Sequence, residues 1–175
     1  MRHWRKPTPF GIAATIFGLL VALRFLNITP GAPTDAPSPA EPATVRFVLD
    51  GDTVELSDGR RVRLLGIDAP EMAHHDQSEQ PFARESTQWL DQLLQNRKVT
   101  LIKGRPAVDR YGRTLAWIFT ESGENVSELA LRSGMARLLD AFGLPPEYES
   151  GLRQAAAYAQ VTRSGLWSRT RRSRP

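Results

Sequence analysis

The stretch Val45–Leu65 reads VRFVLDGDTVELSDGRRVRLL and alternates apolar with polar residues between two turn-forming sequences. The first of these is an Asp-Gly pair at residues 50–51, and the second is Ser-Asp-Gly-Arg at residues 57–60. Such sequences are typical of tight turns between antiparallel strands. We therefore expect three short strands, at residues 45–49, 53–56 and 61–65, joined in a meander.

The residues that follow this meander predict further strands and helices. Asn125 is a suitable N-cap for one helix, and Pro145-Pro146 is a favourable start for another. The expected helices cover residues 80–95, 126–133 and 147–162, and the additional strands cover residues 98–103 and 114–119. Five strands with a helix between the third and the fourth favour an α+β, mainly β fold. We expect a five-stranded OB-like Greek-key barrel with three packed helices, preceded by an N-terminal hydrophobic anchor helix.

The N-terminal residues 1–28 have the pattern of a membrane-targeting segment. A cationic start, Met1–Lys6, precedes the almost wholly apolar run Phe10–Leu23. This order is typical of a secretory signal peptide or of an uncleaved signal-anchor, and its charges favour a cytoplasmic N-terminus. No small-x-small cleavage site follows the run immediately, which favours a retained anchor. We expect the protein at the extracytoplasmic side of the cell envelope, anchored in the membrane or secreted after cleavage.

Composition divides the rest of the chain into three parts. Residues 29–43 contain five prolines and read as an extended Pro/Ala-rich linker without helix or sheet. Residues 44–168 are the expected folded domain, and residues 169–175 form a basic tail.

Charge and cysteine content narrow the possible functions. The 175-residue chain has a net charge of +4, but residues 44–167 contain 15 Lys and Arg against 17 Asp and Glu. The basic excess therefore belongs to the two ends, and any attraction of the domain to phosphates must come from a local patch. The absence of cysteine excludes disulfides, thiol nucleophiles and thiolate metal sites.

Two aspartates are placed where a metal site is expected. Asp52 and Asp68 each follow a predicted strand at a point where the chain turns. If they converge at the rim of the barrel, their carboxylates form a hard oxygen site suited to Ca²⁺ or Mg²⁺. The alternative is that Asp50-Gly51-Asp52 serves only as a turn.

Other charged residues nearby have the chemistry of a phosphate site. Arg63 lies in the middle of a strand, where it either binds a ligand or forms a purely structural salt bridge. Glu71 follows Pro70, which sets its direction, although a surface glutamate is the simpler reading. Asp109–Arg113 (DRYGR) places two arginines and a tyrosine around Gly112, either to grip a phosphate or as a solvated turn.

Three motifs together resemble those of the thermonuclease family, the staphylococcal-nuclease-like enzymes. They are DGDT at residues 50–53, RLLGIDAPE at residues 63–71 and DRYGR at residues 109–113. The similarity continues through Arg132–Ala136 and Gly165–Trp167, so it covers about residues 45–167. The resemblance implies Ca²⁺ as the cofactor, bound by the side chains of Asp52 and Asp68 and the main-chain carbonyl of Ala69. It further implies three catalytic residues, which are Arg63, Glu71 and Arg113.

The resemblance also implies a reaction and a substrate. The reaction is Ca²⁺-dependent endonucleolytic hydrolysis of single-stranded or flexible DNA and RNA by metal-assisted water attack. Arg110 and Tyr111 match positions that touch a phosphate, and Phe142 is placed to stack on a base, whereas Asp140 departs from the family pattern. We expect a monomer without an obligate protein partner. The alternatives are a non-catalytic nucleic-acid-binding OB-like module tethered at the cell envelope, and an envelope scaffold.

Overall fold

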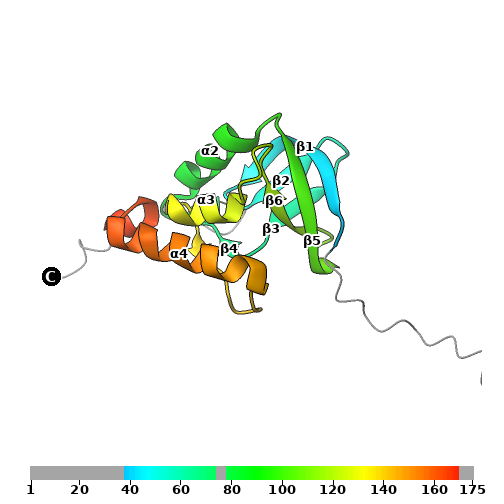
Figure 1. Cartoon of the computed structure of the whole chain (residues 1–175). Coiled ribbons are helices and arrows are strands. Elements are labelled where there is room, and N and C mark those ends of the chain that lie inside the picture. Colours follow the sequence, from blue (N-terminus) through cyan, green and yellow to red (C-terminus); the bar gives the residue numbers. More distant parts are fainter. Residues whose placement is uncertain (1–37, 74–77, 170–175) are drawn as a thin grey trace, which may run out of the picture. The chain divides into compact units, whose positions relative to one another are not determined.

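The computed structural model describes residues 38–73 and 78–169, and these contain the barrel and all of the expected helices except the anchor (Figure 1). The predicted anchor at residues 1–28, most of the predicted linker and the basic tail beyond Arg169 lie outside the described residues. Within the described ranges, no helix has both the length and the apolar character needed to cross a membrane.

Five strands form a closed barrel in the order β1-β2-β3-β6-β5. The strands are β1 (Ala40–Asp50), β2 (Thr53–Leu56), β3 (Arg61–Leu64), β5 (Lys98–Val108) and β6 (Thr114–Phe119). β3 and β6 pair in parallel, whereas the other neighbours are antiparallel. The expectation of a five-stranded barrel built on the meander of residues 45–65 is thereby confirmed.

The first strand is longer than its sequence predicts. β1 begins at Ala40, and Ala40–Thr44 pairs with β5, so the expectation that residues 40–43 belong to a sheet-free linker is wrong. The pairing with β2 starts only at Val45. Among the described strands, the first residues of β1 thus pair on one side only, and Pro42 can turn its donor-free nitrogen to the other side. Glu41 fixes this segment by ion pairs to Arg60 and Lys103.

Three helices lie to one side of the barrel (Figure 1): α2 (Ala83–Leu94), α3 (Val126–Arg132) and α4 (Pro146–Thr162). α3 and α4 lie side by side, and α2 packs against β1 (Figure 1). Asn125 is the N-cap of α3, as expected, and its side chain accepts a hydrogen bond from the Ser127 N–H at 2.9 Å. α2 begins later than expected because its N-cap, Phe82, has a left-handed backbone at φ 73°, so the right-handed helix cannot extend to the residues before it.

Two short elements were not predicted. β4 (Ile67–Asp68) pairs antiparallel with β7 (Arg137–Leu138), and a 3₁₀ helix, η1 (Gly165–Arg169), follows α4. Two residues are too few to show an alternating pattern, so β4 and β7 leave no signal in the sequence. The pair is nevertheless important, because it fixes Asp68 at the point where the chain leaves the barrel.

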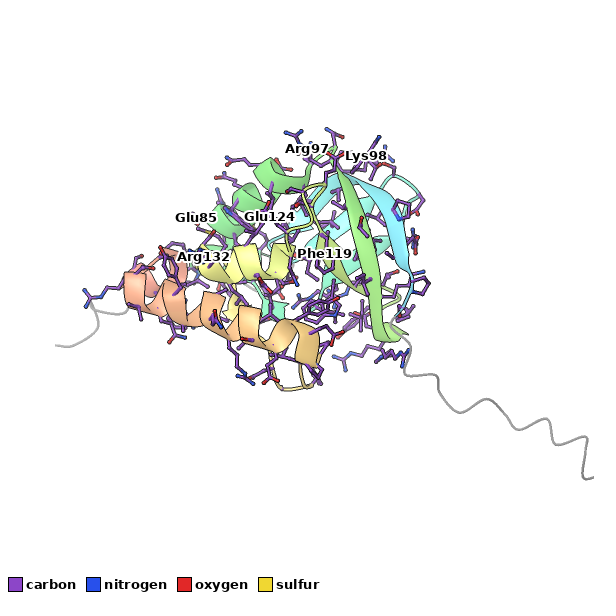
Figure 2. The ribbon with its side chains drawn as sticks, in the orientation of Figure 1. Glu85, Arg97, Lys98, Phe119, Glu124 and Arg132 are labelled. Atoms are coloured by element: carbon purple, nitrogen blue, oxygen red, sulfur yellow. The ribbon has the colours of Figure 1, made fainter. Side chains whose placement is uncertain are left out.

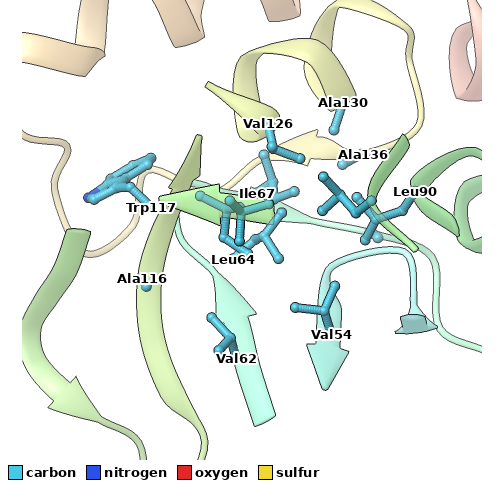
Figure 3. Close-up of a cluster of buried hydrophobic side chains, with 14 of the residues drawn as sticks. Val54, Val62, Leu64, Ile67, Leu90, Ala116, Trp117, Val126, Ala130 and Ala136 are labelled. Atoms are coloured by element: carbon cyan, nitrogen blue, oxygen red, sulfur yellow. The ribbon is translucent and has the colours of Figure 1, made fainter. Parts of the chain in front are cut away.

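The hydrophobic core joins the barrel to the helices. Figure 3 shows Val54, Val62 and Leu64 from the barrel gathered with Ile67 and with Leu90 of α2, and all of them are fully or almost fully buried. Ile67 is buried while the next residue, Asp68, is exposed. Burial of Ile67 therefore places the Asp68 carboxylate at the surface beside the barrel.

Gly66, between β3 and β4, is predicted to be intolerant of a side chain. It has φ +76°, and an added Cβ would lie 2.7 Å from the Trp117 ring and 3.3 Å from Leu152. Gly66→Ala should lower the free energy of unfolding by about 2–4 kcal/mol, the sum of backbone strain and overpacking. Urea unfolding measures this.

The matched control is Gly123→Ala. Gly123 has φ +85° but no atom within 4 Å of an added Cβ, so only the backbone strain of about 1–2 kcal/mol applies. Equal losses in the two variants would contradict the packing of Gly66 against Trp117.

Candidate active site

Asp52 is a buried carboxylate at the start of β2. Only 4% of its side chain is exposed. Its Oδ2 accepts a hydrogen bond from the Ala69 N–H at 2.8 Å and pairs with Arg63 Nη1 at 2.9 Å. Its Oδ1 accepts a hydrogen bond from the Thr53 hydroxyl at 3.1 Å. Asp52 is therefore more than a turn residue, since it joins the β1–β2 turn to β3 and to the segment after β4.

Arg63 holds the two expected metal ligands close together. Its Nη1 contacts Asp52, and its Nη2 contacts Asp68 Oδ1 at 3.1 Å. Nη1 also donates to the main-chain carbonyls of Leu64 and Ile67, each at 3.0 Å. Only 12% of the Arg63 side chain is exposed. The two carboxylates contact neighbouring nitrogens of one guanidinium, so the expected convergence of Asp52 and Asp68 is observed.

The electrostatics of Asp52 favour a further cation. Burial raises the pKa of Asp52 to about 7, and the carboxylate of Asp50 acts in the same direction, against the opposing effect of Arg63. One guanidinium therefore compensates this buried negative charge only in part. Asp68 adds a second carboxylate, and 55% of its side chain is exposed. A partly compensated buried carboxylate beside an accessible one fits a hard divalent cation.

The side chains alone do not complete such a site. Among residues 38–73 and 78–169, no group of three or more His, Cys, Asp or Glu side chains is close enough to hold a metal ion. A cation between Asp52 and Asp68 would thus need main-chain oxygens, water or substrate as its other ligands. The family resemblance implied the main-chain carbonyl of Ala69 as one of these oxygens, and the N–H of the same residue already contacts Asp52.

Glu71 and Arg113 meet in an open cleft of about 690 Å³. The lining residues are Gly59, Arg60, Arg61, Glu71, Tyr111, Gly112 and Arg113. The lining therefore comes from the β2–β3 turn, from the segment after β4 and from the loop before β6. Two of the three expected catalytic residues belong to this cleft, and Glu71 connects it along the chain to Asp68 and Ala69.

Asp109 orders the loop before β6. Its Oδ1 accepts hydrogen bonds from the N–H groups of Tyr111 and Arg113, at 2.8 and 3.0 Å. Its Oδ2 accepts a hydrogen bond from Arg113 Nε at 2.8 Å. Gly112, at φ +80°, permits the tight return of the chain. Within residues 38–73 and 78–169, Nε is the side-chain nitrogen of Arg113 that is hydrogen-bonded, and its terminal nitrogens can reach a phosphate in the cleft.

The expected substrate-contact residues do not all lie together. The guanidinium carbons of Arg110 and Arg113 lie 4.7 and 5.5 Å from the centroid of the Tyr111 ring, and Tyr111 is 67% exposed. Phe142, on the loop between β7 and α4, is 90% exposed and is not among the residues that line the cleft. Asp140, on the same loop, forms an ion pair with Arg153 at 3.0 Å.

Sequence reasoning missed several residues of this region. Arg60 and Arg61 line the cleft, and the alternation that places Arg63 also puts Arg61 on the same face of β3. Arg137 pairs with Asp68 in the β4–β7 register and lines a second pocket, of about 240 Å³, together with Asp68 and Ala69. No local sequence pattern could have indicated that pocket, because β4 and β7 are far apart in the chain.

Comparison with known proteins is consistent with this geometry. A family model described as staphylococcal nuclease homologue matches residues 61–169, which is more than half of the chain. The chain belongs to this family. The matched range begins at β3 and includes Arg63, Asp68, Glu71 and Arg113. The recognition made from the three motifs is thereby confirmed.

Individual members of the staphylococcal nuclease homologue family show the extent of the likeness. A thermonuclease of Staphylococcus hyicus is 34% identical over 125 residues, which are 69% of this chain and 72% of that protein. An uncharacterized endonuclease of Escherichia coli O157:H7 is 35% identical over 124 residues, 69% of this chain and 73% of that protein. A probable endonuclease lcl3 of Aspergillus clavatus is 36% identical over 126 residues, but this chain covers only 42% of its length.

Removing Arg63 should destabilise the metal-free protein in a pH-dependent way. Arg63→Ala leaves the buried Asp52 carboxylate without its ion-pair partner, which costs about 3–5 kcal/mol when Asp52 is charged. Because burial holds the pKa of Asp52 near 7, the folded protein takes up a proton there as the pH falls. Urea unfolding in the presence of a chelator should therefore show that Arg63→Ala lowers the free energy of unfolding strongly at pH 8 and clearly less at pH 5.

Asp68→Asn is the control for this variant. It removes the exposed partner of the same guanidinium and should cost less than about 1 kcal/mol at pH 8. A loss for Arg63→Ala that does not change between pH 5 and pH 8 would be inconsistent with a buried, partly compensated Asp52.

Proposed function

We propose that the protein is a Ca²⁺-dependent endonuclease that hydrolyses single-stranded or flexible DNA and RNA. The observation that carries this proposal is the cleft that Glu71 and Arg113 both line. Glu71 follows closely in the chain after Asp68, which belongs to the Asp52–Arg63–Asp68 cluster. These residues supply the functions that phosphodiester hydrolysis requires: a cation site, a carboxylate for water and guanidinium groups for phosphate. The names of the relatives, thermonuclease and endonuclease, support the same class of reaction.

The cation site uses the acidic groups at the barrel rim. Asp52 and Asp68 would hold Ca²⁺ with their carboxylates, and Ala69 would contribute its main-chain carbonyl. Bound Ca²⁺ supplies a Lewis acid for a phosphate oxygen. The bond between Arg63 and Asp68 lies at the exposed side of the cluster, so exchanging it for a cation–carboxylate contact costs little. The bonds of Arg63 to the carbonyls of Leu64 and Ile67 can persist through this exchange.

Glu71 and the arginines act on the substrate itself. Glu71 orients the attacking water or takes its proton as the water oxygen bonds to phosphorus. One P–O ester bond breaks, and the leaving oxygen takes up a proton from solvent, which yields a phosphomonoester and a free hydroxyl group. Arg113, anchored through Nε by Asp109, donates from its terminal nitrogens to the equatorial oxygens as negative charge accumulates. Arg63 Nη2, which contacts the exposed Asp68 carboxylate, would donate to the same phosphate in the substrate complex.

The shape of the cleft supports a flexible, single-stranded substrate. The cleft is open, and the exposed ring of Tyr111 lines it, close to the guanidinium groups of Arg110 and Arg113. An unpaired base would reach the face of this ring by displacing the exposed Arg110 guanidinium. Stacking of an unpaired base on an aromatic ring stabilises binding by about 1–3 kcal/mol with little sequence preference. A base inside a duplex is already stacked on its neighbours and cannot make this contact.

The proposal includes a location. The cationic and then apolar pattern of residues 1–28 supports an attachment of the nuclease to the extracytoplasmic face of the cell envelope. Fractionation of expressing cells, with detection of the full-length or the shortened chain, tests this part independently of the chemistry.

Cleavage of denatured DNA by the full chain tests the proposed reaction. The protein should cut in Ca²⁺ and stop when a chelator is added. Glu71→Gln should lower kcat by about 10²–10⁴-fold, because the amide cannot accept the proton of the water. Glu121→Gln, in the exposed turn after β6, is the control and should cut like the wild type. Binding without cleavage by the wild type would instead identify a non-catalytic nucleic-acid-binding module.

A further inference from the structure

Arg61 lines the cleft but has no part in the reaction described above. It is the first residue of β3, and 64% of its side chain is exposed. The one ion pair that the described part of the chain shows for it is a 3.9 Å contact with Glu55. At that distance and exposure the contact binds the guanidinium only weakly. Arg61 therefore presents a nearly uncompensated positive charge to the cleft.

The strand register aligns Arg61 with the two arginines proposed to hold the scissile phosphate. Residues at positions i and i+2 of a strand share a face, so Arg61 and Arg63 point to the same side of β3. β3 pairs in parallel with β6 with Val62 opposite Thr114, and this register places Arg61 beside Arg113. Positions two apart on a strand are separated by about 6.6 Å. That separation is similar to the distance between consecutive phosphates in an extended single strand of nucleic acid.

Arg60 shows that an arginine can line the cleft without being available to bind a phosphate. It precedes Arg61 and lines the same cleft, but its guanidinium forms close ion pairs with both Asp58 and Glu41. Its charge is satisfied within the protein, and it also fixes the start of β1. Of these two arginines, only Arg61 is available to an anionic ligand.

We propose that Arg61 binds the backbone phosphate next to the scissile phosphate, so that the cleft holds two consecutive phosphates of the substrate strand. This inference rests on the proposed nuclease function and extends it to substrate length. It predicts that a substrate with several phosphates is preferred over one with a single phosphodiester. It also predicts that Arg61 contributes to the salt dependence of binding. Each phosphate that is neutralised on a single strand steepens the fall of log K with log salt concentration by about 0.7.

Kinetics of the full-length protein on two substrates test this assignment. The substrates are a dinucleotide with one phosphodiester and a single-stranded decanucleotide of mixed sequence. Arg61→Ala should lower kcat/KM for the decanucleotide at least about tenfold more than for the dinucleotide, as expected for loss of a charged hydrogen bond. The salt slope of kcat/KM on the decanucleotide should fall by about 0.7, and Arg61→Lys should restore the slope.

Arg97→Ala is the matched control for loss of one positive charge. Arg97 is exposed, does not line the cleft and lies beside Lys98 at the end of the barrel where α2 leads into β5 (Figure 2). This variant should have the wild-type kcat/KM on both substrates and the wild-type salt slope. Arg61→Ala results that match those of Arg97→Ala would overturn the inference. So would an equal loss on the two substrates, because Arg61 would then act at the scissile phosphate.

A binding measurement separates this inference from the proposed function. Fluorescence anisotropy of a labelled decanucleotide in chelator follows binding without cleavage. If the wild type fails to cleave in Ca²⁺, the proposed reaction is wrong, yet a weaker affinity and a smaller salt slope for Arg61→Ala still support the phosphate contact. If Arg61→Ala binds the decanucleotide with the wild-type affinity and slope, the contact does not exist.

Discussion

The site depends on the burial of one carboxylate, that of Asp52. A charge removed from water costs several kcal/mol unless nearby groups compensate it. Here Arg63 Nη1 and the Ala69 N–H supply this compensation at 2.9 and 2.8 Å. The two partners belong to β3 and to the segment after β4, so satisfying Asp52 draws three separate pieces of chain to one point. The same contacts leave Asp68 beside Asp52 and direct the following residues, up to Glu71, toward the cleft.

The barrel sets the direction in which several of these side chains point. Val62 and Leu64 point inward from β3, so Arg63 between them must point outward, and burial of Ile67 places Asp68 at the surface. The parallel pairing of β3 with β6 brings the loop that carries Arg113 next to the same strand. Arg63 and Asp68 are thus positioned by strand register and by core packing, whereas Glu71 lies on the segment after β4 and Arg113 on the loop before β6.

Features with a strong local pattern could be predicted from the sequence. The meander and the capping role of Asn125 could be predicted, because alternation and turn residues specify them locally. The convergence of Asp52, Arg63 and Asp68 was expected through the resemblance of the three motifs, since the residues alone also allowed a simple turn and a structural salt bridge. The start of β1 at Ala40 was missed, since proline content argues against a strand unless the one-sided pairing is known. The β4–β7 pair and the position of Phe142 outside the cleft depend on contacts between distant segments, which no local pattern encodes. Arg61 had the necessary signal, its spacing of two from Arg63, but its importance appears only with the register to β6.

The most direct test is calorimetric titration of Ca²⁺ into the wild type and into Asp52→Asn, with folding of each protein checked by thermal unfolding. If the buried carboxylate anchors the cation, the wild type binds Ca²⁺ and Asp52→Asn, while still folded, binds it at least about a hundredfold more weakly, as loss of a charged ligand implies. Equal Ca²⁺ affinities in the two folded proteins would contradict the account, because Asp52 would then be only the structural partner of Arg63.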